Sequence, residues 1–401
     1  MKLTASTAAL ALALSATSAS AAAVPPVGAG IPLTRPTSNV TLYDAYPAML
    51  ARVAAKFGGT VPAELKPPPS IWAADPLGND GSWIFYGPVT VGGQVFQMDF
   101  DTGSSDIWIP DVSVPELPFQ HKYDRKKSKT FKNIGADFSI QYGLGSATGK
   151  SASEEITIAG VTVKGQVFGD VTTTKDFYKN GSDGVFGLAF PALLALGGRM
   201  WIENAMAQGT VTSTVFGVYL SETGGSELVI SGYNPNHFSG EIGWIPVLSP
   251  YQFWTVNVVD IRRNGATINP THIRGAVTAI LDTGTTLVVG PNADITKLNT
   301  QIGAKLVNGR WTIPCERRNA KDKIDFVLNG FTITLTAKEY VFTDGDNTCI
   351  STFSAVDMNG NPQWILGDTI LRKYYSIYDM GQVKAGYKGA RVGLALAKAY
   401  S

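Results

Sequence analysis

The chain has 401 residues, of which 44% are hydrophobic and 16% charged, and its formal net charge at pH 7 is +1. This length predicts about two domains with enough apolar material for packed cores. The nearly balanced charge argues against a nucleic-acid partner, which needs a strongly basic face, and we interpret the basic run at 122–132 as a solvated surface loop.

The first 22 residues have the pattern of a secretory signal peptide. Lys2 supplies a positive start, Ala9 to Leu14 form an apolar centre, and small residues follow at 18–21. The apolar centre is too short to span a bilayer, and no later apolar run reaches about 18 residues. We therefore expect a soluble secreted (extracellular) protein with no membrane partner, and a vacuolar location as the alternative.

Residues 23–70 are interpreted as a pro-segment. They are rich in Ala, Pro and Val, with a predicted helix around Tyr43 to Phe57, and Pro67 to Pro69 stiffen the connection that follows. The region is too short and too poor in apolar residues to form a core of its own.

From Ile71 onward, short apolar runs of strand length alternate with turns, in a chain with 43 Gly and 22 Pro, which favours a fold made mostly of β-sheets. In the first half we predict strands at 83–91, 94–100, 106–110, 138–142, 155–158 and 161–168, a hairpin tip at 143–145, and a helical stretch within 191–209. In the second half we predict strands at 216–220, 227–232, 253–261, 374–379 and 391–396, and a helix at 291–302 with Asn292 as its N-cap.

The motif Asp-Thr-Gly occurs twice, with its aspartates at Asp101 and Asp282, 181 positions apart. Each copy follows an apolar strand and precedes hydroxyl residues, which can hold a carboxylate by hydrogen bonds, while the Gly permits the turn that lifts it off the strand. One copy alone would indicate an ordinary turn. Two copies in matching settings, each followed by an apolar-apolar-Gly segment (184–188 and 364–368), indicate an internal duplication that pairs two carboxylates.

These residues resemble those of the pepsin-type aspartic endopeptidases, and they are most similar to the secreted fungal members. The resemblance runs from about residue 71 to the end, and is carried by Phe100 to Ser105, Trp108, Tyr142-Gly143, Leu281 to Thr286 and Ile365 to Asp368. In addition, 31–33 resembles the start of a pro-segment and 74–77 the start of a mature chain. The resemblance implies a mostly β, bilobal fold with few short helices and a cleft between two pseudo-symmetric lobes, 71–245 and 246–401.

The resemblance also implies roles for individual residues. Asp101 and Asp282 would form the catalytic dyad, one from each lobe. The residues expected to support the dyad are Thr102, Gly103, Ser104, Thr283, Gly284 and Thr285, with the two threonines interlocked beneath it. The residues expected to bind substrate are the flap residues Tyr142, Gly143 and Leu144, together with Trp108, Asp99 and Thr286.

The chemistry of such a dyad follows from its charge. Two carboxylates about 3 Å apart cannot both ionise, so they share a proton over an acidic pH range. The ionised carboxylate takes a proton from an attacking water, and the protonated one donates to the developing oxyanion. We therefore expect an acid-active endopeptidase that hydrolyses internal peptide bonds of proteins and peptides, with no cofactor and no metal.

Two residues depart from the usual pattern. Leu144 follows the flap Tyr-Gly, where relatives often carry a polar or acidic residue, so we expect lysine at P1, just before the cleaved bond, to be poorly accepted. Asp99 lies two residues before Asp101 and therefore on the same strand face. It is either a solvent-linked acid at the edge of the cleft or a subsite acid that selects basic or polar side chains.

Other residues suggest precursor and surface chemistry. Lys56 or Lys66 is a candidate to pair with the dyad in a zymogen, with a solvated lysine as the alternative for each. Cys315 and Cys349 are the two cysteines, and in an oxidising compartment we expect them to form one disulfide. The glycosylation acceptors by pattern are Asn39 and Asn180.

Other functions fit less well. The chain lacks the Gly-x-Ser-x-Gly motif of a serine hydrolase and the His-Glu-x-x-His motif of a zinc protease. The acids at 99–101 are reminiscent of a magnesium-dependent phosphatase, but the secretory leader and the second Asp-Thr-Gly argue against it. The remaining alternative is a non-catalytic peptide-binding or inhibitor-target protein on the same fold. We expect a monomer.

Overall fold

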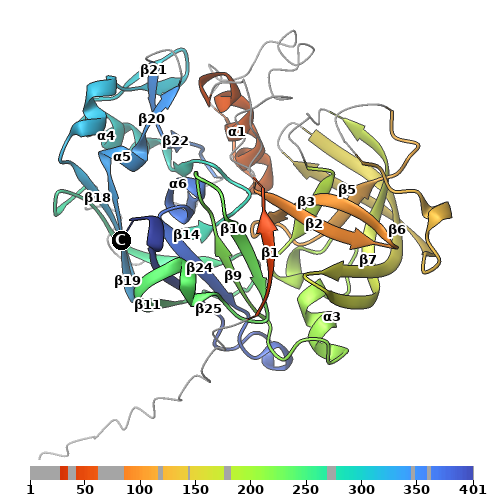
Figure 1. Ribbon diagram of the computed structural model, residues 1–401. Coiled ribbons are helices and arrows are strands. Elements are labelled where there is room, and N and C mark those ends of the chain that lie inside the picture. Colours follow the sequence, from red (N-terminus) through yellow and green to blue (C-terminus); the bar gives the residue numbers. More distant parts are fainter. Residues whose placement is uncertain are drawn as a thin grey trace, which may run out of the picture.

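The computed structural model describes residues 28–34, 42–61, 85–115, 121–142, 145–175, 182–268, 277–344, 348–358 and 363–400. Several predicted features lie outside the described residues: the signal peptide, the proposed mature start at 74–77, Lys66, the flap-tip residues Gly143 and Leu144, and both glycosylation acceptors, Asn39 and Asn180. The described residues form four β-sheets and a few short helices, as expected for a mostly β fold (Figure 1).

The first half of the chain forms a seven-stranded sheet within the described residues. Its strand order is β2 (Tyr86–Val91), β3 (Gln94–Asp101), β8 (Gly184–Gly187), β4 (Ile107–Pro110), β7 (Val161–Lys175), β6 (Gly145–Ile158) and β5 (Lys132–Tyr142). Strands β6 and β7 are longer than predicted, because β6 is paired along its length with β5 and β7. This pairing overrides the weak local β-propensity of its Gly, Ser and Lys residues.

The second half forms an eight-stranded and a four-stranded sheet within the described residues. The larger sheet contains β19 (Phe331–Thr336), β18 (Lys323–Leu328), β12 (Thr255–Arg263), β14 (Thr278–Leu281), β23 (Gln363–Leu366), β15 (Val288–Gly290) and β22 (Phe353–Ala355), with β13 (Ala266–Thr267) paired to β12. The smaller contains β16 (Lys305–Val307), β17 (Arg310–Thr312), β21 (Thr348–Ser351) and β20 (Val341–Asp344).

A six-stranded sheet combines strands from both halves with one from the proposed pro-segment. Its order is β1 (Ala29–Leu33), β10 (Ser226–Ile230), β9 (Val215–Tyr219), β24 (Tyr374–Asp379), β25 (Arg391–Ala397) and β11 (Phe238–Pro246). Strands of the first half and of the second half therefore pair with one another in this sheet. β1 is its outermost strand and is paired antiparallel with β10.

The predicted internal duplication is confirmed by the strand pairing. In the first half, β3 and β4 both pair with β8, parallel and antiparallel respectively, and β4 pairs parallel with β7. In the second half, β14 and β15 pair with β23 in the same two senses, and β15 pairs parallel with β22. The two halves therefore present the ends of β3 and β14 in equivalent positions.

The helices of the described residues are short except α1 (Leu42–Lys56) and α4 (Asn292–Ile302). The predicted helical stretch at 191–209 contains a 3₁₀ turn, Pro191–Leu193, and α3 (Trp201–Ala207). The prediction of Asn292 as an N-cap is wrong: Asn292 is the first helical residue, and Pro291 occupies the cap. The Asn292 amide is instead satisfied by Asp357 Oδ1 at 3.0 Å, a long-range contact. The remaining short helices are α5 (Ala337–Tyr340), α6 (Asp368–Leu371) and the 3₁₀ turns Arg125–Lys127, Pro235–His237, Cys315–Asn319, Val383–Ala385 and Lys398–Tyr400.

Helix α1 lies between the two β-rich halves (Figure 1). Its buried residues Tyr46, Leu50, Val53 and Ala54 recur at helical spacing. They pack in one cluster with side chains of the second half, which include Leu287, Val289, Ile350 and Ile365. Because this apolar face is packed against the second half, the orientation of the opposite, basic face of the helix is fixed. Among the described residues, no helix is both long and apolar enough to cross a membrane.

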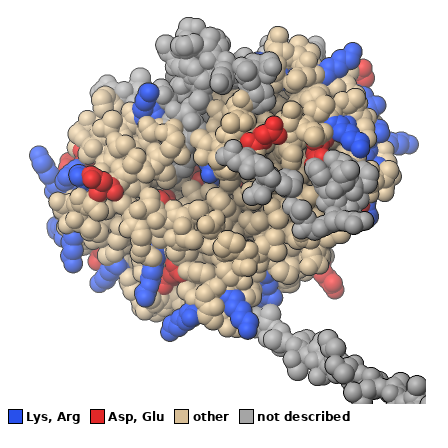
Figure 2. All heavy atoms as spheres, turned by 180° about the vertical axis from the view of Figure 1, so that it is seen from behind, with Lys and Arg blue, Asp and Glu red and all other residues tan. Residues whose placement is uncertain are grey.

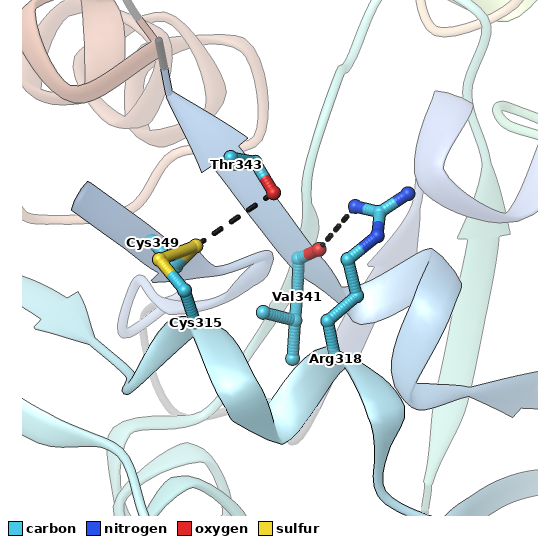
Figure 3. Close-up of a disulfide and its surroundings, with 5 residues drawn as sticks. All are labelled: Cys315, Arg318, Val341, Thr343 and Cys349. Carbon is cyan, nitrogen blue, oxygen red and sulfur yellow. Dashed lines mark hydrogen bonds between the residues drawn. A yellow bond between two sulfur atoms is a disulfide. The ribbon is translucent and has the colours of Figure 1, made fainter. Parts of the chain in front are cut away.

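The predicted disulfide is confirmed. Cys315, on a 3₁₀ turn, is joined to Cys349 on β21, and Figure 3 shows the bond beside Thr343 and the Arg318–Val341 contact. Arg318 Nη1 donates to the Val341 carbonyl at 2.9 Å, so the turn is tied to β20 as well as to β21.

Basic side chains do not gather into one stripe on the face shown in Figure 2. Lys and Arg lie mainly near the outline of the molecule, with a broad area of other residues between them. Within the basic run, Arg125 is paired with Asp111 and Asp170, at 3.2 and 2.9 Å.

Candidate active site

The two Asp-Thr-Gly turns meet where β3 and β14 end. Asp101 is the last residue of β3, Asp282 directly follows β14, and both side chains are fully buried. Thr102 and Thr283 interlock between them. Thr102 N donates to Thr283 Oγ1 at 3.0 Å, and Thr283 N donates to Thr102 Oγ1 at 2.9 Å. The predicted interlock is therefore present, and it brings together carboxylates that are 181 positions apart.

Each carboxylate is held in the same way by its own turn. Gly103 N donates to Asp101 Oδ1 at 2.9 Å, and Gly284 N donates to Asp282 Oδ1 at 3.0 Å. The hydroxyls of Ser104 and Thr285 donate to the other oxygens, Asp101 Oδ2 at 2.6 Å and Asp282 Oδ2 at 2.5 Å. Hydrogen bonds of this kind favour the ionised form of a carboxylic acid.

The glycines of the two turns are required by close approach. A Cβ on Gly103 would lie 2.5 Å from Asp282 Oδ1, and a Cβ on Gly284 would lie 2.4 Å from Asp101 Oδ1. Each glycine therefore faces the aspartate of the other half, and a larger residue would push the two carboxylates apart.

Lys56, at the end of α1, contacts both aspartates. Its Nζ donates to Asp101 Oδ1 at 2.5 Å and to Asp282 Oδ1 and Oδ2 at 2.8 and 2.9 Å, and its side chain is 3% exposed. The interpretation of Lys56 as a solvated lysine is therefore wrong, and the pairing hypothesis holds in this structure. Because one ammonium reaches both carboxylates, the two acids share a single small site.

The charges of the site shift one another. Burial alone would lower the pKa of Lys56, but Asp101 and Asp282 raise it above its ordinary value. Burial alone would raise the pKa of Asp101, but Lys56 and then Arg52 lower it well below its usual range. For Asp282, burial and the Asp101 charge outweigh Lys56, so the pKa is raised. The pair thus separates into one strongly acidic and one weakly acidic group, and its titration belongs to both residues.

Asp99 is not a solvent-linked acid in this structure. It is 1% exposed, and its Oδ2 accepts a hydrogen bond from Arg52 Nη2 at 2.8 Å. Arg52 is a residue of the site that was not among the predicted ones. The available signal was its position four residues before Lys56, which places both cations on one helix face.

The other predicted substrate-binding residues surround the site in different ways. Trp108 is 1% exposed and packs with Phe138 of β5, Ala147 of β6, Val171 and Val185. Tyr142 ends β5, where its backbone pairs with Gly145. The Thr286 carbonyl accepts hydrogen bonds from the Thr369 amide and hydroxyl, both at 3.0 Å. The structure places all three near the duplicated turns or the hairpin, and their contacts with substrate stay a prediction.

Comparison with known proteins identifies the class that this fold and site define. A family model described as eukaryotic aspartyl protease matches residues 84–390. The chain belongs to this pepsin-like family, and it is an aspartic-type endopeptidase.

Its relatives include cathepsins. Cathepsin E of Oryctolagus cuniculus is 35% identical over 329 residues, which cover 78% of this chain and 82% of that protein. Cathepsin E of Rattus norvegicus is 36% identical over 327 residues, covering 78% and 81%. Cathepsin D of Gallus gallus is 33% identical over 323 residues, covering 76% and 80%.

Proposed function

We propose that this chain is the latent precursor of an acid-active, secreted endopeptidase in which Asp101 and Asp282 share one proton and activate water. The observation that carries the proposal is that a single ammonium, Lys56 Nζ, contacts both buried carboxylates. Two acids this close, each held by a backbone amide and a hydroxyl, have the arrangement needed for general acid and base catalysis.

The proposed reaction uses the two acids in opposite protonation states. The ionised carboxylate takes a proton from water as the water oxygen attacks the peptide carbonyl. The protonated carboxylate donates its hydrogen to the carbonyl oxygen, which would otherwise carry the developing negative charge. The tetrahedral intermediate then collapses and its C–N bond breaks. The carboxylate that was protonated by water gives its proton to the leaving amine, while a hydroxyl of the intermediate returns its proton to the other carboxylate as the C=O bond re-forms. Asp101 and Asp282 thus exchange protonation states in the first step and return to their initial states in the second, and no covalent bond to the enzyme forms.

Lys56 explains why the precursor would be latent. It occupies the place where water and the substrate carbonyl must lie, and α1 is anchored by its apolar contacts with the second half. Residues 23–70 act in this proposal as the pro-segment, after a signal peptide at 1–22. The two lobes are 71–245 and 246–401, joined through the six-stranded sheet that also includes β1.

Acid would release the pro-segment because the pKa of Asp101 is lowered in the precursor. The pKa of Asp101 is lowered by Lys56, so the contact stabilises the precursor at neutral pH and weakens as acid protonates the pair. Lys56, whose pKa is raised, keeps its charge throughout this range. Latency at neutral pH and activity in acid follow from one ion-paired cluster.

The remaining assignments concern the setting of the enzyme. The disulfide fits an oxidising compartment, which supports secretion, with the vacuole as the alternative. We propose that Asn39 and Asn180 are glycosylation acceptors, that the enzyme is a monomer of the fungal secreted type, and that Tyr142, Gly143, Leu144, Trp108 and Thr286 line the substrate path.

The decisive experiment is to express the whole precursor, acidify it, sequence the new N-terminus and assay cleavage of haemoglobin or casein. We expect cleavage in acid that a statine-type inhibitor blocks and that chelators leave unchanged. Tight inhibitor binding without any cleavage would instead support the non-catalytic peptide-binding alternative.

A further inference from the structure

Asp99 and Asp101 form a pair of acids that matches a pair of bases on α1. The two acids are two residues apart on β3, so they project to one face, about 7 Å apart along the strand. Arg52 and Lys56 are four residues apart, so they share a helix face, about 6 Å apart along the axis. Arg52 Nη2 lies 2.8 Å from Asp99 Oδ2, and Lys56 Nζ lies 2.5 Å from Asp101 Oδ1.

The pairing with Arg52 satisfies only part of the Asp99 carboxylate. Oδ2 accepts from Arg52, whereas Oδ1 is buried and has no hydrogen-bond partner among the described residues. Arg52 is the more accessible member, with 24% of its side chain exposed against 2% for Asp99. A buried carboxylate is costly unless a cation pairs with it or a proton neutralises it. Removal of α1 therefore leaves a buried acid that faces the vacated space beside the dyad.

We propose that in the processed enzyme Asp99 is a specificity-determining residue that binds a lysine or arginine side chain of the substrate, in the place that Arg52 fills in the precursor. The inference rests on the proposed function, because a peptide must lie across the dyad for its side chain to reach Asp99. Arg52 is then an internal stand-in for the substrate cation, and it shows that a guanidinium on a long flexible stem reaches this carboxylate from the side of the dyad that α1 covers.

The groups around Asp99 give the preference a pH dependence. Burial raises the pKa of Asp99 to about 6, against the opposing effects of Arg52 and Lys56 and with a further upward effect from Asp101. Its neighbours across the sheet are Tyr86, whose pKa burial raises above its ordinary value, and Val185. Tyr86 is therefore neutral in acid. In the processed enzyme a substrate cation would replace Arg52 beside this buried acid. The preference for a cation should therefore be weak near pH 4, where Asp99 is protonated, and should grow as the pH rises toward 6.5 and Asp99 ionises.

The test uses matched peptides and the acid-processed enzyme. Each position near the cleaved bond carries either lysine or norleucine, its uncharged analogue, and kcat/KM is measured for both between pH 4 and pH 6.5. At one position we expect the lysine-to-norleucine ratio of the wild type to rise about tenfold or more over this range, the effect of a charge-assisted hydrogen bond. Asp99→Asn should cleave the norleucine peptides and give a ratio that does not change with pH.

Asp170→Asn is the matched control. Asp170 is another buried acid of the first half, and burial raises its pKa to about 6. Its partner, Arg125 at 2.9 Å, lies outside α1. This variant should keep the wild-type ratio at every pH.

The outcomes separate this inference from the proposed function. Absence of cleavage of any peptide in acid would refute the proposed function itself. Cleavage of norleucine peptides with a wild-type ratio that stays flat at every position would overturn only the role of Asp99, and this measurement needs no variant. An Asp99→Asn enzyme that retains the rising ratio would overturn it as well.

Discussion

Thr102 and Thr283, 181 residues apart, exchange hydrogen bonds in both directions across the boundary between the two halves. Each backbone amide donates to the other's hydroxyl oxygen. The hydroxyls in turn donate to carbonyls of the opposite half, Thr283 to Phe100 at 2.6 Å and Thr102 to Leu281 at 3.0 Å. Because all four bonds cross the boundary, the position of one aspartate is fixed with respect to the other.

Replacing Thr283 by Val should destabilise the protein strongly. The substitution leaves the buried Thr102 amide and Phe100 carbonyl without the Thr283 hydroxyl, and each such group costs about 1–3 kcal/mol. We expect the free energy of unfolding in urea to fall by about 2 kcal/mol or more. Thr157→Val is the control, since Thr157 pairs with Thr162 on a half-buried strand and should change stability by less than about 1 kcal/mol. Equal losses for the two variants would contradict the special role of the interlock.

Replacing either aspartate of the proposed dyad should abolish catalysis. In Asp101→Asn or Asp282→Asn the shared proton and the general base are lost, and general acid and base catalysis contributes about 10²–10⁴-fold to a rate. We expect kcat of the acid-processed enzyme on a peptide substrate to fall by at least about 10³-fold, with KM much less affected. Asp170→Asn keeps the dyad and should retain kcat. Substantial turnover by either dyad variant would rule out the proposed mechanism.

Lys56→Gln should weaken latency at neutral pH. The wild-type contact requires ionised Asp101, whose pKa is lowered. The stability that it contributes is therefore complete above the ordinary aspartate pKa of about 4 and is lost progressively as the pH falls from there through the lowered pKa of Asp101. Without Lys56, the close acids repel and α1 is held by its apolar face and Arg52. We expect the pH at which the precursor begins to bind a statine-type inhibitor to rise by about one unit or more.

The control for latency is Lys127→Gln. Lys127 is exposed and lies 3.8 Å from Asp124, away from the dyad, so its loss should leave the inhibitor-binding profile unchanged. A Lys56→Gln precursor that becomes accessible at the same pH as the wild type would show that the apolar face of α1 alone sets latency.

Local patterns predicted the parts of the site that recur within the sequence. The two Asp-Thr-Gly turns could be predicted because Asp, Gly and hydroxyl residues lie next to each other in the chain. The cap of α4 was assigned wrongly because Asn292 is adjacent to the helix, whereas the group that satisfies its amide, Asp357, is 65 residues away. The pairing of Asp99 could likewise not be predicted, since its partner Arg52 lies on a separate element, 47 residues earlier. Contacts between distant segments leave no periodic signal in a single sequence.

Loss of the disulfide should lower stability while leaving the chemistry in place. Cys315 and Cys349 are 34 positions apart, and closing a loop of this size stabilises the fold by roughly 3–4 kcal/mol on the chain-entropy model. We expect the double variant Cys315→Ser/Cys349→Ser to unfold at lower urea concentration, with kcat/KM at 25 °C within about twofold of the wild type, because neither cysteine takes part in the described hydrogen bonds of the dyad.

Thr343→Val separates the covalent link from local packing, since it removes only the hydroxyl 3.7 Å from Cys349 Sγ, and it should unfold like the wild type (Figure 3). Full reduction of the wild type should bring its midpoint to that of the double variant. A midpoint that complete reduction leaves unmoved would mean that the sheet around β21 holds the loop without the bond.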